Sequence, residues 1–319
     1  MRYSKPRRDS VPMDGTQGKH RHSYSGLQTR KNAAMGDAGA IAPASLRLSP
    51  INGDATQFVW FYVLGPNNGE ELALSIRSIQ KNFAGTAEIT VIGDKPAWYG
   101  GHYIPLQKFS GIKDHKNRMA YRDTQHKLVT CVADSEIDEE FVWMMDDCFM
   151  LKPTTIEDMR IQRYDPWYKV SMKSTWHKLI GDTFGVLRKN GKPTLQYGTH
   201  LPHVFTKTNL LDMFQRYQYP RNLYLFEILY GNNYRNQDEA LPYSGIFNEI
   251  EYPSFLVRHL TPQKLDQLEL TDSNFLNYQS PCWNQTMKTW VEQRLSEEIG
   301  EPNDQKSKVW RRRDNSVRH

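Results

Sequence analysis

Runs of hydrophobic residues, broken by glycine, proline and asparagine, organise the first part of this chain. Residues 58–64 are all apolar and end at the turn 65–69, and a second strand-like run at 88–94 ends in Gly-Asp. Between them, residues 70–83 carry leucine, isoleucine and phenylalanine at helical spacing. Continuous apolar runs are typical of strands covered on both faces. This segment therefore predicts a strand, a helix and a parallel strand joined by a right-handed crossover.

A short third strand is predicted at residues 102–106, followed by a helix at about 114–133. An acidic turn then leads into an apolar run over residues 141–153, which holds the adjacent carboxylates Asp146 and Asp147 and stops at a proline. This pattern predicts a buried strand that carries both acids to its C-terminal edge.

The second half of the chain has a different pattern. Residues 183–188 and 193–197 flank the pair Asn190-Gly191, which predicts a β-hairpin. No repeat occurs at a fixed period. Further predicted elements are helices at about 209–217, 223–230 and 283–299, and a strand at about 251–260.

Composition separates the ends of the chain from its middle. Residues 1–54 mix lysine and arginine with small residues and show no apolar period, so we expect a disordered basic arm. The predicted domain spans residues 55–262, with halves at 55–153 and 154–262, and residues 263–319 add a helix and a basic tail. The order of elements predicts an α/β fold, with a Rossmann-related, mixed but mainly parallel sheet flanked by helices and an added hairpin and helical region.

The overall composition is that of a globular protein with disordered ends, since 38% of the 319 residues are hydrophobic and 24% are charged. Cys131, Cys148 and Cys282 lie far apart without metal-binding spacing, which favours a reducing compartment. No stretch is apolar enough to cross a bilayer, and no signal-peptide core follows the N-terminus. We therefore expect a cytoplasmic protein.

Both ends of the chain are basic, and the net charge is +5. Such arms could hold nucleic acid or anionic lipid by electrostatic attraction, or could be solvated tails. The charge does not choose between these interpretations.

The carboxylates Asp146 and Asp147 are the main candidates for chemistry. Two unpaired carboxylates side by side in a buried strand are costly, and a divalent cation would offset that cost. A hard cation bound by carboxylates keeps coordination positions for phosphate oxygens, so the pair is a candidate clamp for a diphosphate. The alternative is that both residues cap the backbone of an ordinary turn.

Together these segments resemble a known family. The first strand, the motif Leu-x-Leu-Ser-Ile-Arg-Ser-Ile at 72–79, the strand that ends in Gly-Asp and the run 141–151 are similar to GT-A nucleotide-sugar glycosyltransferases. The resemblance covers residues 58–260 and is nearest to the Stealth-type capsular sugar transferases, which carry a similar helix, an Asn-Asp-Asp strand end and a later His-x-Pro segment. Met145 departs from the pattern, because the family often has Asn or Asp there.

The resemblance implies a cation-dependent reaction. Asp147 would bind Mn²⁺ or Mg²⁺, the cations that oxygen ligands favour. Asp146 would hold the ion through water or contact the donor sugar. The cation would neutralise the nucleoside diphosphate as it leaves.

The resemblance also implies a nucleotide site. The base would lie against Val63, Leu64 and Gly65, with Asp94 close to the ribose or a uracil. Alternatively, Asp94 is only a turn residue. Cations on the helix before the acids could reach a diphosphate or could form a solvated face. These cations are Arg118, Arg122, His126 and Lys127.

An acceptor hydroxyl loses a proton as it attacks, so an inverting enzyme needs a general base. Asp238 and Glu239 lie in a polar loop of the second half and are the candidates for this role. The alternative for both is the first turn of an exposed helix, where acids are common.

A histidine-rich segment and an aromatic residue complete the candidate site. His203, or its neighbour His200, could supply a third metal ligand or a phosphate contact, and either could be a structural histidine instead. Trp176 and His177 could line an acceptor site, although an aromatic residue beside a helix is often part of the core.

These features predict a metal-dependent glycosyltransferase that moves a sugar from a nucleotide-diphosphate sugar to a hydroxyl acceptor such as a glycan. One alternative is transfer of a sugar 1-phosphate, which releases a nucleoside monophosphate. Another is a nucleic-acid-binding protein or a DNA-modifying glycosyltransferase that holds DNA through the basic arms. A further alternative is a fold of this kind that has lost its chemistry.

Overall fold

The computed structural model shows a folded region between residues 55 and 296. The basic arm expected at residues 1–54, the end of the chain after residue 296 and the candidate bases Asp238 and Glu239 lie outside the described residues. The described residues are 55–65, 67–109, 118–161, 163–164, 174–235, 241–242, 249–252, 254–269 and 273–296.

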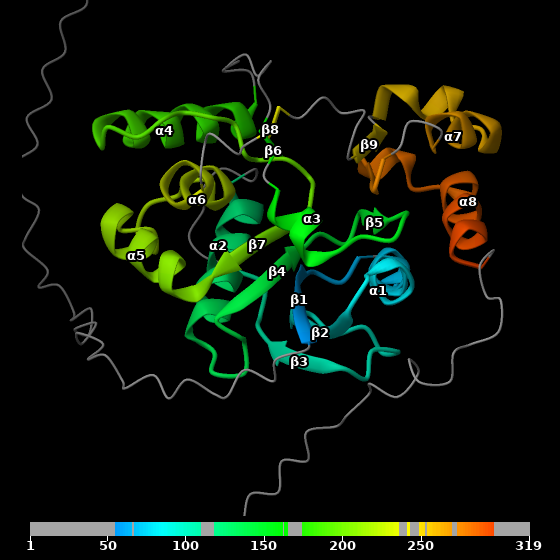
Figure 1. The fold of residues 1–319 in the computed structure, drawn as a ribbon, viewed down its shortest axis with the longest axis horizontal. Helices are drawn as coiled ribbons and strands as arrows, with labels where there is room; N and C mark the ends of the chain where they lie inside the picture. Colours follow the sequence, from blue (N-terminus) through cyan, green and yellow to red (C-terminus); the bar gives the residue numbers. More distant parts are fainter. Residues whose placement is uncertain are drawn as a thin grey trace, which may run out of the picture. The chain divides into compact units, whose positions relative to one another are not determined.

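The core of the fold is a mixed, mainly parallel sheet (Figure 1). Its strands are β1 (Ala55–Tyr62), β2 (Thr86–Gly93), β3 (His102–Pro105), β4 (Glu140–Met144) and β7 (His203–Thr206). They follow the order β3-β2-β1-β4-β7. The first four are parallel to one another, and β7 is antiparallel to β4. The fold class predicted from the hydrophobic runs is therefore confirmed.

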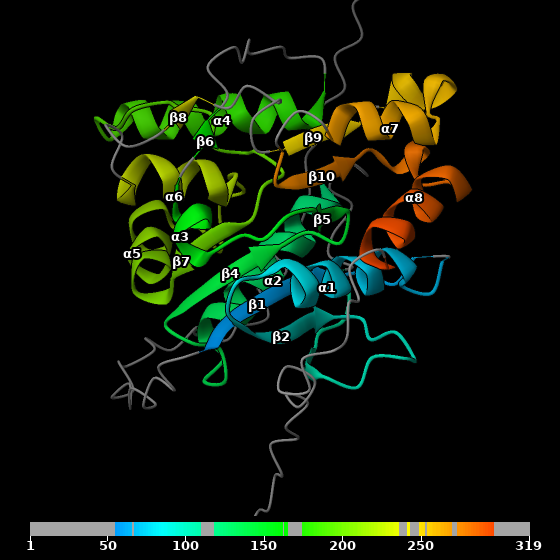
Figure 2. The ribbon, with the colours of Figure 1, turned by 45° about the vertical axis from the view of Figure 1, so that its right-hand side comes forward.

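The helix α1 (Glu70–Asn82) covers one face of this sheet (Figure 2). Its Leu72 shares a buried cluster with Phe58 and Trp60 of β1, whereas the intervening Val59 belongs to the cluster on the opposite face. Side chains alternate between the two faces of a strand. The unbroken apolar run of β1 thus reflects a strand that is buried on both sides.

The opposite face is covered by helices that come mainly from the second half of the chain. These helices are α2 (Met119–Ala133), α4 (Thr175–Lys189), α5 (Lys207–Tyr217) and α6 (Phe226–Tyr234). Leu128, Leu187 and Ile228 are fully buried in their shared cluster. Burial of one such side chain contributes about 1.5–3 kcal/mol, so this cluster fixes the helices against the sheet. None of the helices that the structure describes has the length and hydrophobicity needed to span a bilayer.

The hairpin predicted around Asn190-Gly191 is wrong, because the residues before this pair form α4. Ser174 caps the helix by accepting a hydrogen bond from the N–H of His177, and the buried side chains of α4 recur at helical spacing. Gly191 follows the helix with a φ of 64°. Asn-Gly pairs favour positive φ both in hairpin turns and at helix ends, and the short run 183–188 did not distinguish the two.

A second, smaller sheet brings the C-terminal part of the chain beside the acids. Its strands are β5 (Cys148–Met150), β10 (Phe275–Tyr278) and β9 (Glu249–Tyr252). The middle strand, β10, is antiparallel to β5 and parallel to β9. The strand predicted at 251–260 is shorter than expected, because a 3₁₀ helix follows β9. The remaining elements are α3 (Ile156–Arg160), β6 (Arg163–Tyr164), β8 (Leu241–Pro242), η1 (Ser254–His259), α7 (Pro262–Glu269), η2 (Ser280–Cys282) and α8 (Gln285–Ser296).

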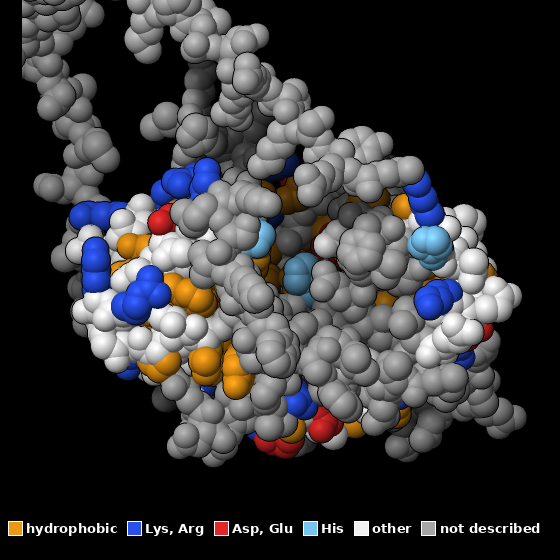
Figure 3. All heavy atoms as spheres, turned by 90° about the horizontal axis from the view of Figure 1, so that it is seen from above, with side chains coloured by type: hydrophobic (Ala, Val, Ile, Leu, Met, Phe, Trp, Pro, Cys, Tyr) orange, Lys and Arg blue, Asp and Glu red, His pale blue; other side chains and the backbone are white. Residues whose placement is uncertain are grey.

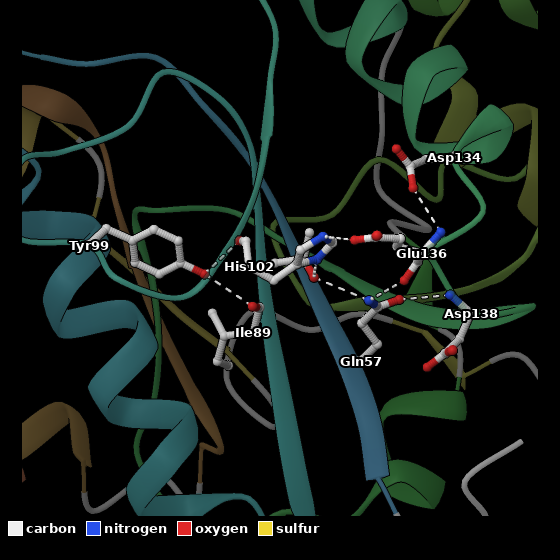
Figure 4. Close-up of polar contacts among 8 residues, drawn as sticks. Gln57, Ile89, Tyr99, His102, Asp134, Glu136 and Asp138 are labelled. Atoms are coloured by element: carbon white, nitrogen blue, oxygen red, sulfur yellow. Dashed lines mark hydrogen bonds and ion pairs between the residues drawn. The ribbon is translucent and has the colours of Figure 1, made fainter. Parts of the chain in front are cut away.

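A polar network joins the strands at the opposite end of the sheet from Asp146 and Asp147 (Figure 4). The side chain of Gln57 on β1 donates to Thr90 Oγ1 on β2 at 3.1 Å and accepts from the Asp138 N–H at 2.8 Å. Thr90 Oγ1 lies 2.9 Å from His102 Nδ1 on β3, and His102 Nε2 lies 2.6 Å from Glu136. This network links three strands to the loop before β4, so we assign it to the register of the sheet.

Candidate metal and nucleotide site

The turn between β4 and β5 presents Asp146 and Asp147 at the C-terminal edge of the central sheet. Ser75 of α1 is fully buried and holds this turn in place. Its hydroxyl donates to the Cys148 carbonyl at 2.7 Å and accepts from the Trp60 indole N–H at 3.1 Å. The position of the two acids is therefore fixed against α1.

Two further polar residues of α1 hold the strand that follows the acids. Ser78 Oγ accepts from the Met150 N–H at 2.9 Å, and Asn82 Nδ2 donates to the Met150 carbonyl at 2.7 Å. Ser75, Ser78 and Asn82 lie along one side of the helix, since residues three and four apart are neighbours there. The serines of the Leu-x-Leu-Ser-Ile-Arg-Ser-Ile motif thus have a structural role in positioning β5.

Three carboxylates influence one another at this turn. Burial raises the pKa of Asp146 to about 7, and the negative charges of Asp147 and Glu71 add to the rise. Glu71, in the first turn of α1, accepts a hydrogen bond from the Tyr278 hydroxyl at 2.5 Å. Burial, this hydrogen bond and the nearby carboxylates raise the pKa of Tyr278. Carboxylates that oppose one another's ionisation form an environment that a cation stabilises.

Neither Glu71 nor Tyr278 is among the residues predicted from the sequence. For Glu71 a signal was present, because two acids open the helix that directly follows the first strand. The C-terminal ends of parallel strands share one sheet edge, so an acid there lies near an acid after β4. For Tyr278 no local signal exists, since only the pairing of β10 with β5 brings it to the turn.

A buried amide from β10 lies beside the acids. Asn277 pairs with Cys148, the residue after Asp147, and is fully buried. Its Nδ2 lies 2.8 Å from His200 Nδ1, while its Oδ1 has no hydrogen-bond partner among the described residues. A buried carbonyl oxygen without a partner is costly, and amide oxygens are ligands for hard cations. Asn277 Oδ1 therefore adds an oxygen of a kind that suits Mg²⁺ or Mn²⁺, on the strand paired with the residue after Asp146 and Asp147.

The acidic residues alone do not complete such a site. Within the described part of the chain, no three His, Cys, Asp or Glu side chains converge closely enough to bind one ion. A cation here would depend on the Asn277 oxygen and on oxygens of its ligand. That coordination is common for Mg²⁺, which usually binds through one or two carboxylates, waters and substrate phosphates.

The structure does not bring the predicted ligand His203 to Asp146 and Asp147. His203 is 2% exposed on β7, and its Nε2 lies 3.2 Å from the Thr199 carbonyl oxygen. Burial, followed by the positive charge of Arg235, lowers the pKa of His203 to about 3, so the ring is neutral. His203 therefore serves the packing of β7, and the neighbouring His200 is the histidine that reaches the site, through Asn277.

The predicted phosphate ligand Lys127 is buried beneath the end of β2. It forms an ion pair with Asp123, one helical turn earlier. Its side chain passes close to Gly93, where an added Cβ would lie 2.7 Å from Lys127 Cε. The charge of Lys127 opposes the rise in the Asp146 pKa. Lys127 thus contributes positive potential to the site while its ammonium group is already paired.

The predicted cations Arg118 and Arg122 lie at the start of α2. Arg122 Nη1 donates to Gln125 Oε1 at 2.8 Å and to the Arg221 carbonyl at 3.4 Å, so it holds the loop between α5 and α6. Arg118 is half-buried at the N-terminus of the helix. Arg118 stays a predicted phosphate ligand.

The predicted nucleotide residues Val63, Leu64 and Gly65 follow β1 at the same edge of the sheet. The Leu64 N–H donates to Asp94 Oδ2 at 2.8 Å. The Asp94 N–H donates in turn to the Tyr62 carbonyl at 3.2 Å. Asp94 therefore lies beside these residues and holds the shape of their loop.

The two residues proposed for an acceptor site, Trp176 and His177, make different contacts in the structure. Trp176 stacks on Tyr121 of α2 with ring centroids 6.0 Å apart and an interplanar angle of 24°. Its indole also lies against Gly198, where an added Cβ would be 3.0 Å from the ring. His177 Nδ1 instead lies 2.5 Å from the hydroxyl oxygen of Ser174, the N-cap residue of the same helix. Trp176 therefore packs against the segment that leads to His200.

One face of the molecule is hollowed, as Figure 3 shows from above the view of Figure 1. Histidine and hydrophobic side chains lie within this hollow, and lysine and arginine side chains lie at the outer margin of the face. A hollow lined in this way suits a ligand that has both apolar and polar parts.

A buried carboxyl group in the second half of the chain was not predicted. Glu227 lies in the first turn of α6 and is 8% exposed. Its Oε2 has no hydrogen-bond partner among the residues that the structure describes. Burial raises the pKa of Glu227 to about 7. The folded protein therefore holds a proton on this group at pH values where an exposed glutamate has lost it.

We expect Glu227→Gln to stabilise the protein at pH 8 and to have little effect on stability at pH 4. The carboxyl ionises near pH 4.5 when it is solvated and near pH 7 in the fold. The unfolded chain therefore releases this proton first, and the free energy of unfolding falls by up to about 3 kcal/mol as the pH rises through that window. Chemical denaturation of both proteins from pH 4 to pH 8 measures the difference. Glu292→Gln, at an exposed position of α8, is the control, and a pH-independent difference for Glu227→Gln would contradict the assignment.

No protein-family model and no curated protein matches this sequence. The fold is similar to that of galactosyltransferase LgtC in complex with donor and acceptor sugar analogues, with 10% identity, a TM-score of 0.42 and coverage of 78% of this chain and 98% of LgtC. It is also similar to the bifunctional glycosyltransferase WbbM, with 8% identity, a TM-score of 0.45 and coverage of 78% of this chain and 51% of WbbM. Likeness at this level carries no information on activity.

Proposed function

We propose that this protein transfers a sugar from a nucleotide-diphosphate sugar to a hydroxyl acceptor, with Mn²⁺ or Mg²⁺ as cofactor. The observation that carries this proposal is the position of Asp146 and Asp147 at the C-terminal edge of a mainly parallel sheet, with the unsatisfied oxygen of Asn277 on the strand paired with Cys148, the next residue. Ligands of such sheets bind at the C-terminal ends of the strands. An oxygen-rich, negatively charged donor set at that edge suits a cation that carries a diphosphate.

Different residues of the chain would bind the cation and the nucleoside and accept the proton. Asp146, Asp147 and Asn277 would hold the cation, and the bound cation would supply positive charge to the departing nucleoside diphosphate. The loop after β1 would hold the nucleoside, with Asp94 keeping the shape of that loop. In the acceptor half, Asp238 and Glu239 remain the proposed bases for an inverting reaction.

Binding and product analysis test this function. We expect Mn²⁺ together with a nucleotide-diphosphate sugar to raise the melting temperature more than either alone, because a ligand that binds only the folded state stabilises it by mass action. Turnover with a hydroxyl acceptor should release a nucleoside diphosphate. Release of a nucleoside monophosphate would replace the proposal with transfer of a sugar 1-phosphate. If no nucleotide sugar binds with or without the cation, the proposal fails.

We expect Asn277→Ala to weaken Mn²⁺ binding by about 10-fold or more, because it removes a neutral oxygen ligand and the contact to His200. Asn277→Asp keeps an oxygen at this position and should bind Mn²⁺ at least as well as Asn277→Ala. Asn274→Ala is a matched control, since Asn274 donates to Thr154 Oγ1 at 3.1 Å near the start of the same strand. Calorimetric titration with Mn²⁺ in the presence of a nucleoside diphosphate measures each affinity. Wild-type affinity in Asn277→Ala would show that Asn277 is not a ligand.

A further inference from the structure

Trp98, in the loop between β2 and β3, is a large aromatic side chain that folding leaves exposed. Of its surface 43% is accessible, and Leu64 in the loop after β1 is 45% exposed. Exposed aromatic surface is costly in water, because burial of apolar area contributes about 25 cal/mol per Å². Both residues follow the C-terminal ends of neighbouring parallel strands, where ligands bind in sheets of this type.

Two contacts at the edge of its ring hold Trp98 in one orientation. Its indole N–H donates to the Asn68 carbonyl at 2.9 Å, and its ring meets Tyr99 at an interplanar angle of 89°. Tyr99 is itself buried, and its hydroxyl lies 3.0 Å from the carbonyl oxygens of both Ile89 and His102 (Figure 4). A rigid aromatic ring loses little conformational entropy when it binds a ligand.

The loops after β1 and β2 support this arrangement together. Asn68 and Gly69 of the loop after β1 both have positive φ, at 48° and 78°, and the Asn68 carbonyl accepts from Trp98 of the loop after β2. A Cβ on Gly69 would lie 2.8 Å from Pro96 Cγ, so the two loops are in close contact there. The bond from Leu64 N–H to Asp94 joins them at a second point. The exposed side chains of Leu64 and Trp98 therefore come from one rigid unit.

The strands that lead to this unit and to the acids are close together in the sheet. β2, β1 and β4 are adjacent in the sheet, with Trp98 following β2 and Asp146 following β4. Two strand spacings of about 4.8 Å separate these strand ends by about 10 Å. An extended nucleoside diphosphate can span that separation, with its base at one end and its diphosphate at the other.

We infer that Trp98 is the platform on which the nucleobase of the donor stacks, with the Leu64 side chain beside it. This inference rests on the proposed function. Every nucleobase presents a flat π face, so stacking supplies affinity with little choice among bases. Trp98 would thus supply part of the affinity for the nucleoside, and the cation would separately supply affinity for the diphosphate.

Binding of ligands with and without a base tests the inference. Isothermal titration in the presence of Mn²⁺ gives the dissociation constants of UDP, CDP, GDP and ADP, and of inorganic pyrophosphate as the ligand that lacks a base. We expect Trp98→Ala to weaken binding of the tightest-bound nucleoside diphosphate by about 10-fold or more and to leave the affinity for pyrophosphate unchanged. Trp98→Phe keeps a smaller ring and should lie between the wild type and Trp98→Ala. It also serves as the test if Trp98→Ala does not fold.

The controls separate the platform from other effects. Leu211→Ala, which truncates an exposed apolar side chain of α5, should bind every ligand as the wild type does. Equal binding of nucleoside diphosphates by Trp98→Ala and the wild type would overturn the inference. If Trp98→Ala loses as much affinity for pyrophosphate as for the nucleoside diphosphates, the inference is also overturned, because Trp98 would then only support the loops. A wild-type protein that binds none of the four nucleoside diphosphates would overturn the proposed function as well, whereas failure at Trp98 alone would leave that function standing.

Discussion

Asp147→Asn is expected to lower cation-dependent turnover of a nucleotide-diphosphate sugar by at least about 100-fold while the protein remains folded. The substitution keeps the size of the side chain and removes the negative charge that would hold the cation. Charge stabilisation by a bound metal is worth several kcal/mol, and about 1.4 kcal/mol corresponds to tenfold in rate. Initial rates with Mn²⁺ or Mg²⁺ over a range of donor concentrations measure the loss.

The stability of the same variant supplies a second measurement. The charge of Asp147 raises the pKa of Asp146, so removal of that charge relieves repulsion within the turn. We therefore expect the metal-free variant to melt at the same temperature as the wild type or higher, and to lose the stabilisation that Mn²⁺ and donor give together. Asp182→Asn, at an exposed position of α4, should behave as the wild type in both assays. Unchanged turnover in Asp147→Asn would show that the cation is bound elsewhere.

Gly93→Ala is expected to destabilise the fold by more than about 4 kcal/mol. Gly93 ends β2 with a φ of 123°, a conformation that residues with a Cβ rarely adopt. The added Cβ would lie 2.2 Å from the Tyr62 carbonyl oxygen and 2.7 Å from Lys127 Cε. The first of these atoms belongs to the backbone of β1, which cannot move without breaking the pairing of β1 with β2. Urea unfolding, together with the soluble yield, measures the effect.

Gly185→Ala is the matched control for this substitution. Gly185 lies in α4, and apart from its chain neighbours and the backbone of its own helix, no described atom lies within 4 Å of the position that its Cβ would take. Alanine is favoured over glycine in a helix by up to about 1 kcal/mol, so this variant should be as stable as the wild type or more stable. Wild-type stability in Gly93→Ala would mean that the loop after β2 adopts a different path from the one described. The nucleotide site proposed beside Asp94 would then need revision.

Patterns within short windows predicted the first half of the fold well. The hydrophobic runs of β1 and β2 and the helical spacing of α1 report burial directly, because a side chain faces the core at an interval set by the local backbone. The Gly-Asp pair at the end of β2 also had a local signal, since glycine is favoured where φ is positive. The same local reasoning failed at Asn190-Gly191, because that pair is compatible with a hairpin turn and with a helix end.

The candidate site was predicted only in part. Asp146 and Asp147 could be found, because two acids that interrupt an apolar run are unusual in any context. Asn277 and Tyr278 could not, because their place beside the acids depends on the pairing of β10 with β5, more than 120 residues earlier in the chain. His203 was chosen over His200 because the sequence alone does not show which of two nearby histidines is buried.

The amino-acid sequence by itself determined the alternation of strands and helices, the mainly parallel sheet and the pair of acids at its edge, because these follow from local patterns of hydrophobic and charged side chains. Only the tertiary structure decided which distant residues lie beside the turn that carries those acids, namely Glu71, Asn277 and Tyr278, and which aromatic ring stands exposed near the ends of β1 and β2. Backbone hydrogen bonds between strands are nearly the same for every residue type. The pairing that assembles the site is therefore selected by the packing of the whole chain.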